Sequence, residues 1–247
     1  MKLLVITGAG SGIGYQMSKK FYKEFYILGI SKFTDQRKNF SHIHKKIKID
    51  INNHKIVKKK LKEFIRKYKN EIKEINFLFC ASIIGNSSKT LEDQLRNWEL
   101  VFKTNIISNL LILQYFKVIL FKTRTRIVFF AGGGAAYEYP LFPSYAVSKI
   151  SSVKIVENLE EDYKNNKDFI IIALSPGSQK TNMQNIVLKY GGKIKTKSNM
   201  KDLFYFISDF LNSNNKKLSG RFFHVNEKIN SIKNINKNRF KLRRILK

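Results

Sequence analysis

Cysteine is almost missing from this chain, because Cys80 is the only one in 247 residues. A secreted domain stapled by disulfides needs at least one pair of cysteines, so a disulfide framework is excluded. No cleavable apolar segment follows Met1 and Lys2. These absences predict a protein of the reducing cytoplasm.

Acidic residues are scarce, with 18 against 47 basic ones, and the formal net charge is +29. Such a surplus raises nucleic acid or an anionic membrane surface as a partner. The lysines are spread along the whole chain, however, so we expect no specific nucleic-acid binding. The one basic concentration is Lys233–Lys247, within a tail of about residues 226–247, and it is typical of a solvated segment. Its apolar residues, such as Phe240 and Leu242, offer another role, which is to pin the tail to the body or to a second subunit.

Long apolar runs and metal-ligand spacings are also missing. The most apolar window, Ile106–Phe121, is interrupted by Ser108, Asn109, Gln114 and Lys117, which indicates a buried helix and no membrane span. The four histidines have no cysteine or histidine partners at zinc spacing, so we expect no metal site. No linker rich in Gly, Pro or Ser divides the chain, which favours one domain.

Short apolar runs alternate with segments of helical periodicity. The predicted strands are Leu3–Ile6, Phe25–Ile30, Ile47–Ile49, Phe77–Ala81, Arg126–Phe130, Phe169–Leu174 and Arg221–Val225. The predicted helices are Tyr15–Lys23, Ile56–Lys69, Leu91–Lys103, Ile106–Phe121, Tyr145 to about Asn165, and Met200–Leu211. This alternation predicts an α/β fold, a doubly wound parallel sheet of the Rossmann type in a single domain over residues 1–247.

A glycine-rich turn, Thr7–Gly14, stands between the first predicted strand and the first predicted helix. Glycines let the backbone turn tightly and approach a pyrophosphate, whose charge is met by free N–H groups at the helix start. Strand, turn and helix in this order predict dinucleotide binding.

A phenol and an ammonium, Tyr145 and Lys149, lie four residues apart where a helix is predicted to begin. That spacing places both on one helix face. A fixed positive charge nearby lowers the pKa of a tyrosine and lets it exchange a proton with a substrate oxygen. The alternative is a tyrosine packed in the core with a solvated lysine one turn on.

With these motifs and the Pro176-Gly177 turn in one order, the sequence resembles the short-chain dehydrogenase/reductase family over nearly its whole length. The resemblance implies that Tyr145 is the acid/base, that Lys149 lowers its pKa and holds the nicotinamide ribose, and that Asn105 orders a proton-relay water. It also implies cofactor contacts by Gly8, Ser11, Gly12, Ile13, Gly14, Asp50, Ile51, Ala81, Pro176, Gly177 and Thr181.

Two departures from the family pattern stand out. Phe79-Cys80-Ala81-Ser82 replaces the usual Asn-Asn-Ala-Gly, and Cys80 is interpreted as a buried small hydrophobe. The serine expected about thirteen residues before the tyrosine is missing, because that stretch reads Phe130–Ala135 with a triple glycine. Losing one donor to the reacting oxygen costs about a hundred to a thousandfold in rate. Backbone N–H groups of the triple glycine can replace it in part, and a serine restored at Ala131 or Gly132 should raise the rate.

The triple glycine, Ser219-Gly220-Arg221 and Leu242-Arg243-Arg244 are similar to a subset of the family encoded with bacterial surface-polysaccharide genes. For the cofactor, Ser31 and Lys32 leave room for and attract a 2′-phosphate, which predicts NADP over NAD. Asp35 is the rival residue, which would instead hold the ribose hydroxyls of NAD.

The sequence thus favours an oxidoreductase that moves a hydride between NADP and an alcohol or ketone. Its rival is a non-catalytic dinucleotide-binding or scaffold protein descended from such an enzyme. We expect a homodimer or homotetramer, formed through the helices at Ile106–Phe121 and Ser144–Asn165. Substrate choice is expected to come from the segment Ser178–Asn199, whose composition names no ligand.

Overall fold

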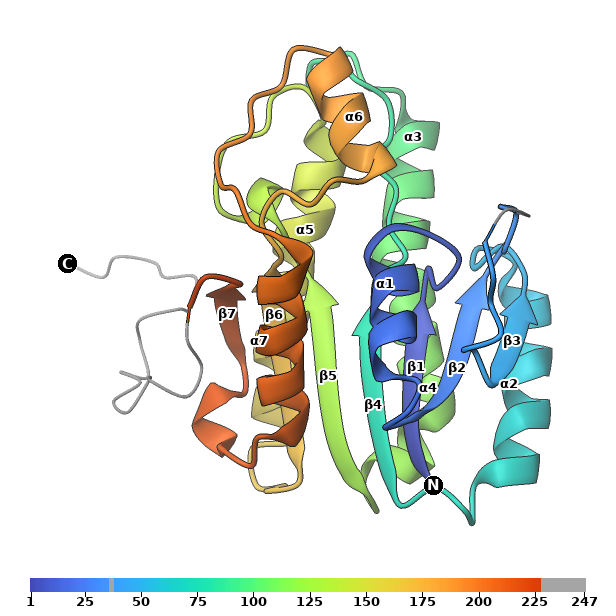
Figure 1. Cartoon of the computed structure of the whole chain (residues 1–247). Coiled ribbons are helices and arrows are strands. Elements are labelled where there is room, and N and C mark those ends of the chain that lie inside the picture. Colours follow the sequence, from blue (N-terminus) through green and yellow to red (C-terminus); the bar gives the residue numbers. More distant parts are fainter. Residues whose placement is uncertain (36–37, 228–247) are drawn as a thin grey trace.

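The computed structural model describes residues 1–35 and 38–227 and has one parallel sheet with helices on both faces (Figure 1). The strands are β1 (Lys2–Thr7), β2 (Tyr26–Ser31), β3 (Lys45–Lys48), β4 (Glu74–Phe79), β5 (Arg124–Phe130), β6 (Phe169–Ser175) and β7 (Arg221–His224). Their order in the sheet is β3-β2-β1-β4-β5-β6-β7, and every adjacent pair is parallel. The predicted fold class, a doubly wound sheet in one domain, is confirmed.

The five inner strands, β2, β1, β4, β5 and β6, are buried on both faces, which explains their mostly apolar sequences. One face carries α2 (His54–Tyr68), α4 (Ser108–Leu120) and α5 (Pro143–Asp162), and the other carries α1 (Gly12–Phe21) and α7 (Met200–Asn212). Side chains of the first three helices pack with the sheet in one cluster, which includes Leu61, Phe116 and Val153. Those of α1 and α7 pack in a second cluster with Met17 and Phe210.

The structure differs from the predicted helices in two places. The helix predicted over Leu91–Lys103 begins at Leu95, as α3 (Leu95–Phe102), because Leu91 is fully exposed and has nothing to pack against. A helix not predicted from the sequence, α6 (Asn182–Lys189), lies within the segment between β6 and α7. It was missed because it is short and none of its residues is buried, so its apolar residues Met183, Ile186 and Val187 make only a weak helical pattern.

A π-helical turn, η1 (Lys103–Ile107), joins α3 to α4 and contains Asn105. Two short 3₁₀ turns complete the elements, η2 (Gly133–Ala135) after β5 and η3 (Lys216–Leu218) before β7. No helix within residues 1–35 and 38–227 is long and apolar enough to cross a bilayer. The basic tail predicted at about residues 226–247 lies outside the described residues except for its first two.

Candidate functional site

A cavity of about 1230 Å³ opens at the carboxyl ends of the strands. Loops that follow six of the seven strands, β1 to β6, line it. The sheet order reverses between β1 and β4, and ligands of open α/β sheets bind at such a switch point. The volume is at the upper end of ligand sites and suits a large cofactor with a substrate beside it.

The glycine-rich loop after β1 is packed too tightly to accept side chains at two positions. A Cβ at Gly8, whose φ is +69°, would lie 2.9 Å from the backbone nitrogen of Ala81 on the neighbouring loop. A Cβ at Gly14 would lie 2.5 Å from the carbonyl oxygen of Gly8. The loop therefore turns directly into α1 and leaves the start of that helix facing the cavity. These residues fit a dinucleotide pyrophosphate.

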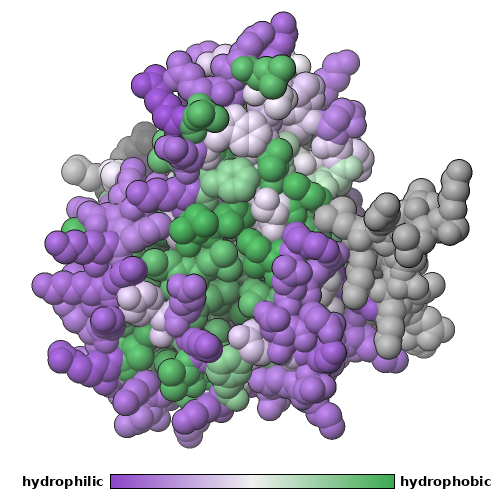
Figure 2. Space-filling model, turned by 180° about the vertical axis from the view of Figure 1, so that it is seen from behind, coloured by the Kyte–Doolittle hydropathy of each residue, from purple (hydrophilic) through white to green (hydrophobic). Residues whose placement is uncertain are grey.

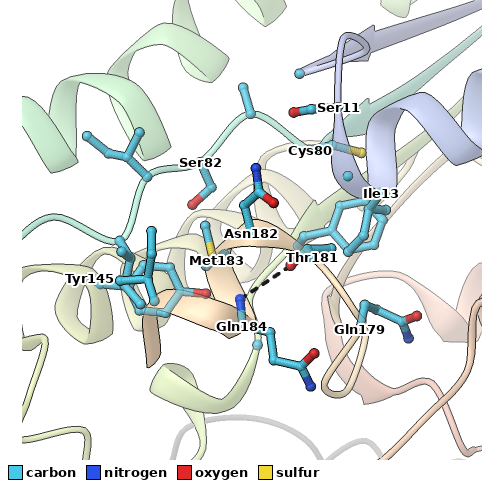
Figure 3. Close-up of a pocket in the computed structure, with 18 of the residues that line it drawn as sticks. Ser11, Ile13, Cys80, Ser82, Tyr145, Gln179, Thr181, Asn182, Met183 and Gln184 are labelled. Atoms are coloured by element: carbon cyan, nitrogen blue, oxygen red, sulfur yellow. Dashed lines mark hydrogen bonds between the residues drawn. The ribbon is translucent and has the colours of Figure 1, made fainter. Parts of the chain in front are cut away.

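Most of the predicted cofactor residues line this one cavity. They are Gly8, Ser11, Gly12, Ile13, Ser31, Lys32, Asp50, Ile51, Ala81, Tyr145, Lys149, Pro176, Gly177 and Thr181. Gly14 does not line it, because it is buried behind Gly8. Figure 3 shows the loop after β6, with Gln179 and Thr181, lying opposite Ile13 of the glycine-rich loop.

Lysine and aspartate meet at the end of the cavity beside β2 and β3. The Lys32 ammonium lies 2.7 Å from a carboxylate oxygen of Asp50. Burial raises the pKa of the Asp50 carboxyl, but hydrogen bonds from Lys32 and the Asn52 amide outweigh it and leave this pKa below its usual value. Asp35 also lines the cavity and forms an ion pair with Lys38 at 3.1 Å. Lys32 therefore stands at the cavity in an ion pair with Asp50.

Tyr145 and Lys149 lie one turn apart on α5, and both are buried. The Lys149 ammonium donates to the carbonyl of Phe130, at the end of β5, at 2.9 Å and lies 5.3 Å from the centre of the Tyr145 ring. Burial lowers the pKa of Lys149 to about 8. Lys149 is therefore mostly charged at neutral pH and loses its proton as the pH rises through about 8.

The pKa of Tyr145 differs from the expectation in direction. Burial raises it, and the neighbouring phenol of Tyr139 raises it further. The structure therefore shows no lowering of this pKa by Lys149, because burial away from water disfavours the phenolate. The Tyr145 phenol stays protonated at neutral pH and is set to donate a proton.

Asn105 lies in the π-turn η1, buried, and does not line the cavity. Its side chain accepts from the Ile83 amide at 2.9 Å and donates to the Ile83 carbonyl at 3.0 Å. It also donates to Ser148 Oγ at 2.9 Å, and that hydroxyl donates to the Tyr145 carbonyl at 2.7 Å. Asn105 therefore joins the loop after β4 to the helix that carries Tyr145.

A family model described as short chain dehydrogenase matches residues 2–189, which is most of the chain. This chain belongs to the short chain dehydrogenase family. The family consists of oxidoreductases that use a nicotinamide cofactor, in agreement with the crevice between β1 and β4.

Several solved structures share the fold at low sequence identity. ElxO with NADP bound has a TM-score of 0.75 at 18% identity, over 91% of this chain and 96% of its own. A putative short chain dehydrogenase from Escherichia coli CFT073 complexed with NADPH has a TM-score of 0.76 at 14% identity, over 92% and 97%. 4-Hydroxyisoleucine dehydrogenase complexed with NADH has a TM-score of 0.71 at 17% identity, over 91% and 96%. No curated protein matches this chain significantly.

The two departures from the short chain dehydrogenase pattern have distinct structural consequences. Cys80 lines the cavity, and burial raises the pKa of its thiol although Lys149 opposes this, so little reactive thiolate forms. Ala131 is 1% exposed and packs in the core on the α4 and α5 side of the sheet. A Cβ at Gly132 would instead lie 3.5 Å from the Tyr145 hydroxyl, although the φ of +88° strains any side chain there. Gly132, and not Ala131, is thus the position that faces the tyrosine.

Ile84, Tyr139, Met183 and Val187 line the cavity and were not predicted from the sequence. They belong to a small apolar cluster with Phe142 and Tyr145. Met183 and Val187 come from α6, which lies over this part of the cavity (Figures 1 and 3). The signal for this helix was Thr181 with Gln184 three residues later, because the Thr181 side chain accepts from the Gln184 amide at 3.4 Å and caps the helix.

No group of three or more His, Cys, Asp or Glu side chains that could hold a metal occurs in the described part of the chain. All four histidines have structural hydrogen bonds, and His224 accepts from the Asn226 amide at 3.2 Å. His42 bonds to Ser18 at 2.9 Å, His44 accepts from the Ile27 amide at 3.1 Å, and His54 bonds to Ser108 at 2.9 Å.

Proposed function

We propose that this chain reduces a ketone or aldehyde to an alcohol, with NADPH as the hydride donor and Tyr145 as the proton donor. The observation that carries the proposal is that Tyr145 and Lys149 line the same cavity as the glycine-rich loop. A bound nicotinamide would supply the hydride.

The chain's own residues have separate tasks in this proposal. Gly8, Gly12 and the start of α1 hold the pyrophosphate, with Ser11 and Ile13 beside it. Lys149 holds the nicotinamide ribose and keeps a positive charge near Tyr145. Asn105 is a positioning residue, because it fixes the loop after β4 relative to Tyr145. The remaining predicted contacts are Asp50 and Ile51 for the adenine, with Ala81, Pro176, Gly177 and Thr181 toward the nicotinamide.

The apolar cluster around Tyr145 favours a substrate with an apolar or aromatic group next to its carbonyl. The test is NADPH oxidation, followed at 340 nm, with 4-nitrobenzaldehyde, acetophenone, cyclohexanone, menadione and a ketose. The ketose is included because the sequence resembles the subset of the family encoded with surface-polysaccharide genes, whose substrates would be sugars. Turnover of at least one carbonyl compound supports the proposal.

The second candidate, a non-catalytic dinucleotide-binding protein, is favoured by the absence of a hydroxyl at Gly132. It predicts tight NADPH binding without oxidation by any carbonyl compound of the panel. That outcome would overturn the reductase proposal and leave the fold assignment intact.

Lys32 is expected to select NADPH over NADH. Replacing it in Lys32→Ala removes one cation beside a 2′-phosphate, so we expect the Kd of NADPH to rise about tenfold, which corresponds to about 1.4 kcal/mol. The Kd of NADH should stay within about twofold. Fluorescence titration gives both constants.

The control for Lys32→Ala is Lys48→Ala, because Lys48 is an exposed lysine of neighbouring β3 that does not line the cavity. It should leave both affinities unchanged. Comparable Kd values for the two cofactors in the parent protein, unaltered in Lys32→Ala, would contradict NADP selection.

We also propose that the chain forms a dimer or tetramer through α4 and α5. Figure 2 shows apolar side chains gathered at the centre of the face behind the sheet, where these helices lie. The exposed large apolar residues of α3, η1, α4 and α5 are Leu95, Leu100, Ile107, Val118 and Val147. Apolar patches of this kind mark interfaces between subunits.

Val118→Lys is expected to dissociate this assembly, because Val118 is 70% exposed. A two-fold interface contains the substituted residue from both subunits, so it would bury two lysine charges that repel each other. Light scattering should show an oligomer for the parent and a monomer for the variant at micromolar concentration. Tyr205→Lys is the control, since Tyr205 is exposed on α7 at the opposite face. A parent protein that is monomeric at micromolar concentration would contradict the assembly.

A further inference from the structure

One buried hydroxyl of the cavity wall has no partner. Ser82 follows β4 and lines the cavity, and its hydroxyl oxygen is buried without any hydrogen-bond partner among the described residues. Buried polar groups are nearly always paired, so an unpaired one needs an explanation. Of the buried side-chain polar atoms without a partner in the described part of the chain, the Ser82 oxygen alone belongs to a residue that lines the cavity.

The backbone contacts place Ser82 across from the proton donor. Asn105 holds the amide and the carbonyl of Ile83, the next residue after Ser82, and reaches Tyr145 through Ser148. Ile84, two residues after Ser82, belongs to the same apolar cluster as Tyr145. Figure 3 shows the hydroxyls of Ser82 and Tyr145 directed toward the same part of the cavity, on either side of Met183.

The hydroxyl oxygens of three other serines near Tyr145 each have a partner. Ser144 accepts from Asn97 at 3.1 Å, and Ser148 bonds to Asn105 and the Tyr145 carbonyl. Ser178 accepts from Gln184 at 2.8 Å. The positions after β5 where a serine was expected carry only Ala131 and Gly132, which have no hydroxyl. Ser82 therefore has an unpaired hydroxyl on the cavity wall near the proposed reaction centre, with Met183 between it and Tyr145 (Figure 3), where another hydroxyl is lacking.

We infer that Ser82 is a catalytic residue that donates a hydrogen bond to the carbonyl oxygen of the substrate. This inference rests on the proposed reductase function. In the reduction, the hydride adds to the carbonyl carbon and the C=O π bond breaks. The oxygen then takes a proton from Tyr145, while Ser82 keeps its own proton and stabilises the negative charge that builds on that oxygen. Ser82 thus performs the task expected of the missing serine, from the loop after β4.

The test compares Ser82→Ala with the parent protein on whichever carbonyl compound of the panel gives the highest turnover. We expect kcat to fall about tenfold to a hundredfold, less than the hundred to thousandfold that one donor to the reacting oxygen typically contributes, because glycine amides remain nearby. The Kd of NADPH should stay within about twofold, since the substrate and not the cofactor loses a contact. The melting temperature should be unchanged or higher, because an unpaired buried hydroxyl is removed. Ser82→Thr should retain most of kcat.

The matched control is Ser88→Ala, because Ser88 also has a buried hydroxyl without a partner but does not line the cavity. It should keep the parent kcat. An unchanged kcat in Ser82→Ala would overturn the assignment, as would a loss that appears only in the Kd of NADPH. Tyr145→Phe in the same assay separates the two claims: if it loses turnover while Ser82→Ala does not, the reductase stands and only the role of Ser82 fails.

Discussion

Tyr145→Phe is expected to reduce kcat by a hundredfold to about ten thousandfold, the range that a positioned general acid contributes. The phenylalanine ring fills the same buried space on α5, so the fold and the Kd of NADPH should be retained. Loss of kcat with cofactor affinity unchanged would be a direct sign that the phenol acts on the reacting atoms. Steady-state kinetics and a fluorescence titration give the two values.

Tyr139→Phe is the matched control for this variant. The Tyr139 ring lies 5.9 Å from that of Tyr145, both residues line the cavity, and burial raises the pKa of each phenol. Tyr139 has no lysine one turn further along a helix, and we expect its replacement to cost less than tenfold. A larger loss in Tyr139→Phe than in Tyr145→Phe would move the proton donor to Tyr139.

Lys149→Met is expected to lose activity and gain stability. The folded protein holds Lys149 with its pKa lowered from 10.5 to about 8, so a charged Lys149 costs the fold about 3 kcal/mol below pH 8. Methionine removes that cost. It also removes the hydrogen bond to the Phe130 carbonyl, and this loss destabilises the variant by roughly 1 kcal/mol. The free energy of unfolding at pH 7 should therefore rise by about 2 kcal/mol, while kcat/KM for NADPH falls at least tenfold.

The pH dependence checks the sign of this effect. Between pH 8 and 10.5 the unfolded chain still binds the Lys149 proton and the folded chain does not, so the cost shrinks as the pH rises. The stability gain of Lys149→Met should disappear by about pH 10.5. In the parent enzyme, kcat/KM for NADPH should fall as the pH rises through about 8. A variant less stable than the parent at pH 7 would contradict the buried cationic lysine.

The parts of the fold that the sequence predicted are those with strong local patterns. Leu3–Ile6 and Phe169–Leu174 are apolar runs, and the structure places each within a strand buried on both faces. The glycine-rich turn was predicted with its flanking strand and helix, because only glycine fits where Gly8 meets Ala81 and Gly14 meets Gly8. The short helix α6 has only a weak pattern of this kind, and its capping residues Thr181 and Gln184 were the clearer signal.

The candidate site was predictable as a set of residues but not in its electrostatics. The spacing of Tyr145 and Lys149 placed them on one helix face, which is where they lie. Spacing says nothing about how deeply a pair is buried, and burial decides the pKa of both groups here. Ser82 was visible in the sequence only as a departure from a family pattern, because an unpaired hydroxyl can be recognised only once its neighbours are placed.

The most direct measurement of the central claim is isotope transfer from deuterated NADPH. The protein would be incubated with the best carbonyl compound of the panel and NADPH carrying deuterium at either face of nicotinamide C4, and the alcohol analysed by mass spectrometry. We predict one deuterium on the carbinol carbon from one of the two labelled cofactors, and a product yield in Tyr145→Phe that is lower by at least a hundredfold. Tight NADPH binding with no deuterium transferred from either face to any carbonyl compound would contradict the account.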